Sequence, residues 1–203
     1  MFPVVEKLPV TLNLSAGEVA PMPMLPEKTK GLYIAIVYNC NMIVSNASTL
    51  ILLAKVNSLS ILLDDIKKIR IPNIVYNEIT GKKDSFEILL IKKEIDKKRI
   101  ILVDVDKKNY ATVLEQFKLD QGEAAAYALL KNIKGKAVLT DDGELIKLCK
   151  IENVPFITAM AAIVKLFKKT KLAKGDALEK LEKLYGYGRY SKGIYDFFKL
   201  EVK

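Results

Sequence analysis

Oxygen-bearing side chains follow several short apolar segments of this chain, at positions where they could bind a cation. They are Asn46 after Ile43–Ser45, Glu78 in IPNIVYNEI, Glu123 at the start of GEAAAYALL, and Asp142 in VLTDDGEL. The chain contains no histidine, so imidazole is available neither as a general base nor as a ligand. Carboxylate and amide oxygens favour hard divalent cations such as Mg2+ or Mn2+. These residues predict a carboxylate metal site if the fold brings them together.

Helix capping offers a simpler explanation for two of these acidic segments. Asp120–Glu123 and Asp141–Glu144 both have the D-x-x-E spacing that satisfies free amides at a helix N-terminus. Carboxylates at that end also gain from the helix dipole. Capping alone accounts for either motif taken singly. Acids from several separate segments on one rim would instead need a cation to offset their repulsion, so the combination favours a metal site.

The elements that must position these residues begin at Met42, where short apolar runs start to alternate with helical patterns. The runs are continuous, as expected for parallel strands covered on both faces. Predicted strands span Ile43–Ser45, Ile69–Ile71, Ile100–Val103, Ala137–Thr140 and Pro155–Thr158. Predicted helices span Thr49–Leu63, Asn73–Ile79, Ser85–Lys97, Lys107–Phe117, Gln121–Lys131, Gly143–Lys150 and Ala159–Lys169. The pattern predicts an α/β fold whose central parallel sheet has about five strands and helices on both faces. Ligands of such sheets bind beyond the carboxyl ends of the strands.

Residues 1–41 differ in composition from the rest of the chain. Most of the prolines lie in the first 26 residues, which disfavours regular structure there. We therefore expect an N-terminal extension over residues 1–41, either poorly ordered or produced by a start codon assigned too far upstream. The folded domain is expected to span residues 42–203. The apolar run Leu32–Tyr38 favours the opposite view, because it could add a strand.

Net charge and cysteine content narrow the class of protein. The formal charge is +9, and the lysines and glutamates of residues 1–41 cancel, so the whole excess lies in residues 42–203. A basic domain with an acidic cluster suggests a polyanionic substrate, although surplus lysine also serves solubility alone. Cys40 and Cys149 are too few for a disulfide framework or a four-cysteine zinc site. With no apolar stretch of membrane-spanning length and no signal peptide, we expect a soluble cytoplasmic protein.

The C-terminal segment LYGYGRYSKGIYDFF is rich in aromatic residues. Tyr187, Arg189, Tyr190 and Lys192 could bind single-stranded nucleic acid by stacking and by charge. The alternative is a helix that docks Ile194, Phe197 and Phe198 on the core. We favour the structural alternative.

Four segments, in this order, resemble the PIN-domain family of nucleases: IVSNASTLILLAK, IPNIVYNEI, GEAAAYALL and VLTDDGELIKLC. The resemblance is closest to a subgroup with a VSN-x-S-P-L-like opening and a GEAEA-like helix. It extends from about Met42 to the C-terminus. It implies a PIN-like three-layer sandwich with an acidic pocket that binds Mg2+ or Mn2+.

The resemblance also assigns roles to individual residues. The implied catalytic residues are Asn46, Glu78, Glu123 and Asp142. The implied metal ligands are Glu78, Glu123, Asp142 and Asp141. The implied accessory or substrate-binding residues are Ser48, Thr140 and Glu144. The chain departs from the family at Asn46, which stands where aspartate is usual; an amide offers a carbonyl oxygen but carries no charge and cannot act as a base.

The function implied by the resemblance is a Mg2+- or Mn2+-dependent endoribonuclease that hydrolyses RNA phosphodiesters. The implied partners are RNA and a small antitoxin protein, with the chain as a homodimeric toxin. Asn46 leaves open an alternative, a catalytically weak or silent PIN-like module that binds RNA or a protein. A nucleotide-binding Rossmann domain is disfavoured because no glycine-rich phosphate loop follows a predicted strand. A receiver-like domain would need an acid where Asn46 stands.

Overall fold

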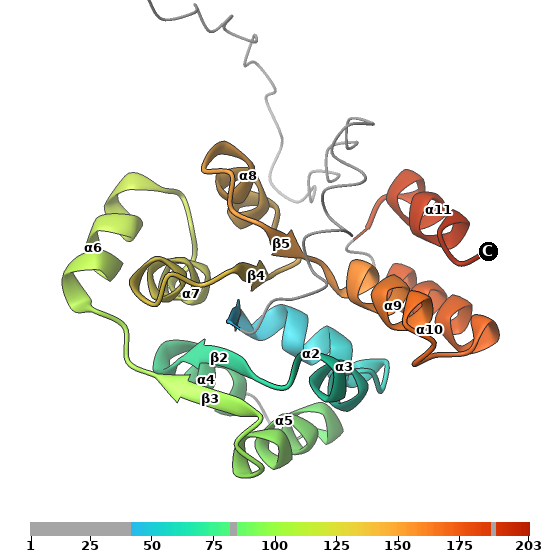
Figure 1. Cartoon of the computed structure of the whole chain (residues 1–203). Coiled ribbons are helices and arrows are strands. Elements are labelled where there is room, and N and C mark those ends of the chain that lie inside the picture. The colour runs from blue at the N-terminus through green and yellow to red at the C-terminus, as the bar shows by residue number, and fades with distance from the viewer. Residues whose placement is uncertain (1–41, 82–84, 188–189) are drawn as a thin grey trace, which may run out of the picture.

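Five parallel strands form the central sheet of this computed structural model, in the order β3-β2-β1-β4-β5 (Figure 1). The strands are β1 Ile43–Ser45, β2 Ile69–Pro72, β3 Ile100–Val103, β4 Ala137–Leu139 and β5 Phe156–Ile157. The structure describes residues 42–81, 85–187 and 190–203, so the extension predicted over residues 1–41 lies outside the described residues. The predicted α/β fold and all five predicted strands are confirmed, with ends that differ by at most one residue.

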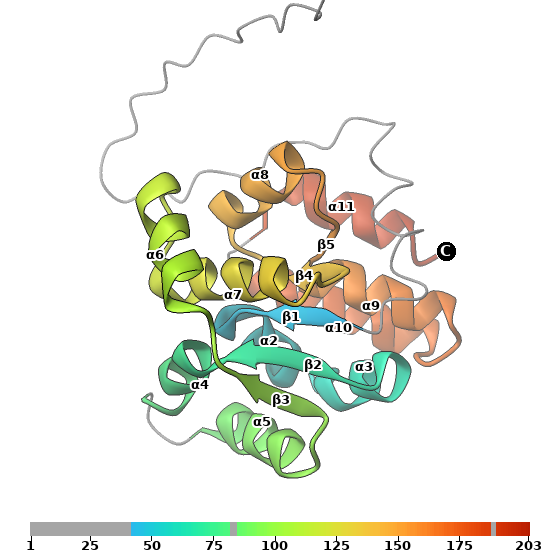
Figure 2. The same ribbon diagram turned by 60° about the vertical axis from the view of Figure 1, so that its left-hand side comes forward.

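Helices cover both faces of the sheet (Figure 2). They are α2 Ala47–Lys55, α3 Leu59–Ile66, α4 Asn73–Thr80, α5 Phe86–Asp96, α6 Lys107–Gln116, α7 Gln121–Asn132, α8 Gly143–Ile151, α9 Ala159–Lys168, α10 Lys174–Gly186 and α11 Lys192–Leu200. One core lies between the sheet and the layer that contains α2, α3, α5 and α9, and the other lies under α6, α7 and α8. Ile43 belongs to the first core and its neighbour Val44 to the second, because successive side chains of a strand point to opposite faces. Burial on both faces explains why the strands are continuous apolar runs.

The single helix predicted over Thr49–Leu63 is wrong, because α2 and α3 are separate helices that meet at 113°. Asn57 between them has a φ of 51°, and its N–H and that of Ser58 bond back to Ala54 O (3.0 Å) and Leu53 O (2.8 Å). Asparagine adopts this left-handed helix-terminating conformation more readily than most residues. Among the described residues, no single helix is long and apolar enough to span a membrane, and only the bent pair α2–α3 reaches that length and composition.

The aromatic C-terminal segment packs on the core. Ile194 and Phe198 of α11 are buried, and Tyr195 stacks on Tyr185 of α10 with ring centroids 4.7 Å apart. Tyr190, which precedes α11, is also buried. The structural interpretation of this segment is therefore confirmed for Tyr190 and α11, whereas Arg189 lies outside the described residues.

Candidate active site

The residues that follow the two central strands cap the helices that come next. Asn46 follows β1, and its Oδ1 accepts a hydrogen bond from Thr49 N (3.3 Å) at the start of α2. Asp142 follows β4, and its Oδ1 accepts from Leu145 N (2.7 Å) at the start of α8. Because β1 and β4 are parallel neighbours, both caps lie at the carboxyl edge of the sheet, towards which the strands run in Figure 2.

Asn46 ties three elements together at this edge. Its side chain is buried, and its Nδ2 donates to Thr140 Oγ1 (3.2 Å) and to Glu123 Oε1 (3.5 Å). Thr140 Oγ1 in turn accepts from the backbone N–H of Asp142 (3.1 Å). The amide oxygen of Asn46 is used at the start of α2, so the NH2 group is the part that faces the acids. Asn46 therefore acts as a donor that links β1, the β4–α8 connection and α7.

Glu123 is the centre of the acidic group. It lies in the first turn of α7 and is half-buried. Burial raises the pKa of Glu123 above its usual value, and the nearby carboxylates of Asp142, Asp120 and Glu78 raise it further, while a bond to its own backbone N–H opposes the shift. These three carboxylates come from three different segments. Glu78, Asp120 and Glu123 line the same hollow, and Asp142 is near enough to contribute to the raised pKa of Glu123.

Small residues of α7 make room for this convergence. Ala124, Ala125 and Ala126 are fully buried, which lets α7 lie close to the sheet. A Cβ added to Gly122 would lie 2.7 Å from Glu78 Oε2, so the α4 carboxylate rests against the glycine. An open hollow of about 610 Å³ lies at this contact. It is lined by Ile74, Asn77, Glu78, Asp120, Gln121, Gly122 and Glu123.

Asp120 is a member of this group that sequence patterns had suggested only as a helix cap. It occupies the N-cap position of α7, yet its side chain makes no capping hydrogen bond. Its carboxylate instead acts on Glu123. The D-x-x-E spacing was the available signal, since it places two acids on one turn of chain.

Asp141, expected to bind the metal, points elsewhere. Both of its carboxylate oxygens accept from Ala159 N (3.1 Å each) at the start of α9, and it also accepts from Tyr190 OH. It is buried. The structure therefore separates the two adjacent aspartates, with Asp142 at the rim and Asp141 turned towards the C-terminal helices.

The remaining predicted accessory residues lie near the rim but make few contacts with the acids. Ser48 is in the first turn of α2, and its buried Oγ has no hydrogen-bond partner among the described residues. Glu144 is exposed and pairs with Lys147 at 2.6 Å. Thr140 is the accessory residue that does join the network, through Asn46 and Asp142.

A hard divalent cation fits the chemistry of this donor set. Within the described part of the chain, no three Asp, Glu or Cys side chains are arranged as a ready-made metal site. The half-buried carboxylate of Glu123, with its pKa raised by burial and then by Asp142, Asp120 and Glu78, is nonetheless the kind of group whose charge a cation would offset.

Comparison with known protein families agrees with this geometry. A family model described as a PIN domain matches residues 42–198, which is more than half of the 203-residue chain. The chain therefore belongs to the PIN-domain family, whose fold is of a nuclease type and whose members generally depend on divalent metal ions. No curated protein matches the chain.

Proposed function

We propose that this protein is a Mg2+- or Mn2+-dependent ribonuclease that hydrolyses RNA phosphodiesters at the carboxyl edge of its sheet. The observation that carries the proposal is the hollow lined by Glu78, Asp120 and Glu123, beside which Asn46 bonds to Glu123 and Asp142 caps the next helix. Such a group of like charges is unfavourable by itself. Its presence at the edge where parallel α/β sheets bind ligands argues for a functional rather than a structural role.

In this proposal Glu78, Glu123 and Asp142 hold the ion. When bound, a divalent ion supplies positive charge that offsets the charge of a scissile phosphodiester and lowers the pKa of an attacking water. Asn46 keeps Glu123 and Thr140 in place through its NH2 group. The N-cap bond from Leu145 N fixes one oxygen of Asp142, which leaves the other oxygen for the ion.

Asn46 also supports a second candidate, a catalytically weak or silent PIN-like module that binds RNA or a protein. The usual aspartate would add a negative charge at the point where Asn46 presents N–H donors to Glu123. With a donor in that position, the site carries one charge fewer and holds a cation less tightly. The two candidates make opposite predictions for cleavage but share the same fold.

The biological role that we propose for an active enzyme is a homodimeric toxin held in check by a small antitoxin protein. Its support is membership of the PIN-domain family. Growth arrest of cells that express the wild-type chain, relieved by Glu123→Gln, is the expected outcome for a toxin. Unimpaired growth with an enzyme that cleaves RNA in vitro would contradict the toxin role alone.

Cleavage of single-stranded RNA by the purified full chain tests the enzymatic proposal. We expect cleavage with Mn2+ or Mg2+, none with EDTA, and a loss of at least about 100-fold in Glu123→Gln, as is common when a group that stabilises the transition state is removed. Asp142→Asn should lose activity too while keeping its helix cap, because asparagine caps as well as aspartate. Glu115→Gln, which alters an exposed acid on α6 outside the predicted site, is the matched control. RNA left intact in the presence of either ion, with Mn2+ still bound, would favour the silent module.

A further inference from the structure

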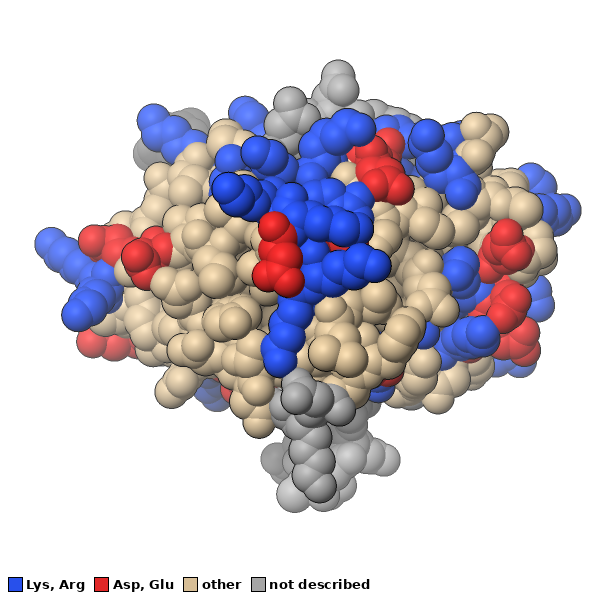
Figure 3. Space-filling model, turned by 90° about the horizontal axis from the view of Figure 1, so that it is seen from below, with Lys and Arg blue, Asp and Glu red and all other residues tan. Residues whose placement is uncertain are grey.

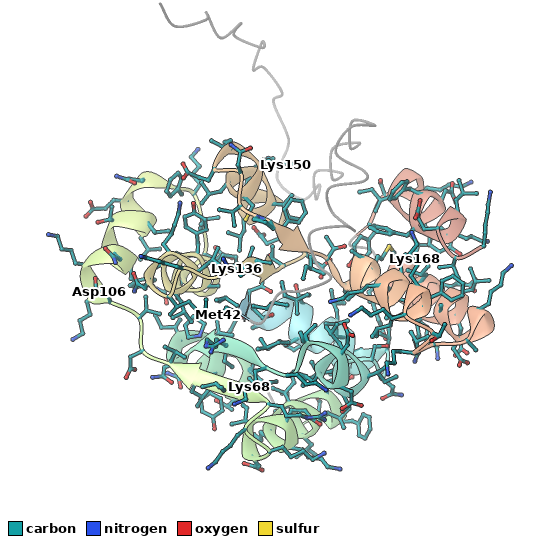
Figure 4. All side chains as sticks on the ribbon, in the orientation of Figure 1. Met42, Lys68, Asp106, Lys136, Lys150 and Lys168 are labelled. Carbon is teal, nitrogen blue, oxygen red and sulfur yellow. The ribbon has the colours of Figure 1, made fainter. Side chains whose placement is uncertain are left out.

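A basic face runs along α5 and reaches the edge of the sheet that lies opposite the acids. We define this basic face by α5, by the α3–β2 turn with Lys67 and Lys68, and by the α5–β3 turn with Lys97, Lys98 and Arg99. Figure 3 shows that Lys and Arg side chains gather in one continuous patch on the side of the molecule where α5 lies in Figure 1. The amino ends of the strands meet at this edge, as the positions of Met42, Lys68 and Lys136 in Figure 4 illustrate.

The two turns are held side by side by backbone and ionic contacts. Ile69 N donates to Arg99 O (2.9 Å), and β2 and β3 pair in register from Ile69 and Ile100. The Arg99 guanidinium bonds to Asp64 and to Glu94. The basic face is therefore built on the rigid amino edge of the sheet and not on independent loops.

Three lysines of this face have no carboxylate partner. Lys68, Lys93 and Lys98 are exposed, and none forms an ion pair within the described residues. Cations gain from the dipole at helix C-termini, which accounts for lysine near the ends of α3 and α5. The dipole does not account for unpaired lysines gathered on one surface, since they repel one another until a polyanion neutralises them.

Exposed apolar side chains share the outer stripe of α5 with this charge. Phe86 is 63% exposed and Leu89 is 55% exposed, and helical spacing places Lys93 on the same stripe. Phe86 and Lys93 are about 10 Å apart along the helix axis. An exposed aromatic ring beside a track of cations is the arrangement that binds single strands, whose unpaired bases can stack.

We propose that the basic face binds single-stranded RNA, with phosphates on Lys68, Lys93 and Lys98 and a base stacked on Phe86. The lysines at the amino edge lie away from the carboxylates, because four strand residues alone separate the two edges by roughly 13 Å, whereas Phe86 begins α5 at the other end of that helix. It would hold a part of the RNA other than the scissile bond. The inference shares its RNA ligand with the proposed function but none of its chemistry, so binding is tested in EDTA, where cleavage is absent.

Fluorescence anisotropy of a short labelled single-stranded RNA, with the full chain in EDTA at several salt concentrations, measures this binding. Lys68→Glu/Lys93→Glu should weaken binding and lower the salt slope by roughly 1.4, which is two phosphate contacts on a single strand. Phe86→Ala should weaken it by roughly tenfold. A duplex of the same sequence should bind less tightly than the single strand. Lys98→Gln, a milder change, should lower the slope by roughly 0.7.

The matched control is Lys171→Glu/Lys174→Glu, which reverses two exposed lysines at the α9–α10 connection. Thermal melting checks that every variant is folded. Retained binding in the control with loss in the basic-face variants supports the proposal. An equal loss in both double variants would mean that net charge alone attracts RNA, and would overturn it. Unchanged binding in Phe86→Ala together with equal duplex affinity would also overturn the single-strand site.

Discussion

At the scale of residues, asparagine at position 46, where the resemblance to PIN domains implies an aspartate, is the feature with the largest consequence. The Asn46 NH2 group lies against Glu123 and Thr140, and its oxygen caps α2. An aspartate could keep the cap but would face Glu123 with a second negative charge. Asparagine at this position is therefore better suited to the metal-free state than an aspartate would be.

Asn46→Asp tests whether residue 46 favours the metal-free protein at the expense of cation affinity. We expect the variant to bind Mn2+ about tenfold more tightly, a gain of roughly 1.4 kcal/mol, and to melt at a lower temperature than the wild type in EDTA, because two carboxylates then repel each other. Melting curves with and without Mn2+ measure both effects. Asn153→Asp in the exposed α8–β5 turn is the control. Weaker Mn2+ binding by a folded Asn46→Asp would show that residue 46 does not face the ion.

The raised pKa of Glu123 makes a prediction about pH. Burial, then Asp142, Asp120 and Glu78, raises this pKa in the folded state, so the folded state holds its proton to higher pH than the unfolded state. Ionisation of Glu123 therefore lowers the free energy of unfolding as pH rises from the usual glutamate pKa to the raised one. Because glutamine does not ionise, Glu123→Gln lacks this decrease in the free energy of unfolding.

Urea denaturation in EDTA, between about pH 4 and pH 8, measures the effect. The stability of Glu123→Gln relative to the wild type should increase with pH across the titration of Glu123 and then stay level. A constant difference between Glu123→Gln and the wild type at all pH values would contradict the assigned direction.

At the scale of elements, the C-terminal helices support the loop that carries Asp142. Tyr190 OH donates to Asp141, whose oxygens also accept from Ala159 N at the start of α9. Asp141 immediately precedes Asp142, so this buried network fixes the position of the chain next to Asp142. The two adjacent acids thus have different tasks, one structural and one at the site.

Tyr190→Phe should lower the free energy of unfolding by about 1.5–3 kcal/mol, the usual worth of a hydrogen bond to a charged group. Tyr187→Phe is the control, since Tyr187 is 42% exposed and its ring lies under Lys55 Nζ, and it should change stability by less than about 0.5 kcal/mol. Urea denaturation compares the two. Equal effects of the two substitutions would mean that the Tyr190 hydroxyl stabilises the fold no more than the exposed hydroxyl of Tyr187, which would contradict the prediction.

Sequence patterns predicted the elements better than they predicted the site. The strands were predictable because burial on both faces makes each one a continuous apolar run. The α2–α3 break was not, because both helices are apolar and only Asn57 marks the turn. Asp141 and Asp142 could not be distinguished either. Which of them turns inwards depends on Tyr190, 49 residues along the chain.

At the scale of the whole molecule, opposite charges occupy opposite edges of one sheet. Asn46 and Asp142 follow the carboxyl ends of β1 and β4, and Glu78 lies on the helix after β2, whereas Lys68 and Lys98 precede or adjoin the amino ends of β2 and β3. The formal charge of +9 is therefore compatible with a negative site, because the parallel sheet keeps the two apart. An RNA strand attracted by the basic face would meet the carboxylates only where an ion has reversed their local charge.

The central claim is that Glu78, Glu123 and Asp142 share one divalent ion. A crystal of the full chain soaked in Mn2+, with anomalous difference density measured at the manganese edge, tests it most directly. We expect a peak at the carboxyl edge of the sheet, within about 2.5 Å of carboxylate oxygens from Glu123 and Asp142, with Glu78 turned towards it and Asp141 still bonded to Tyr190. A peak elsewhere, or none at this edge under conditions in which the protein cleaves RNA, would contradict the account.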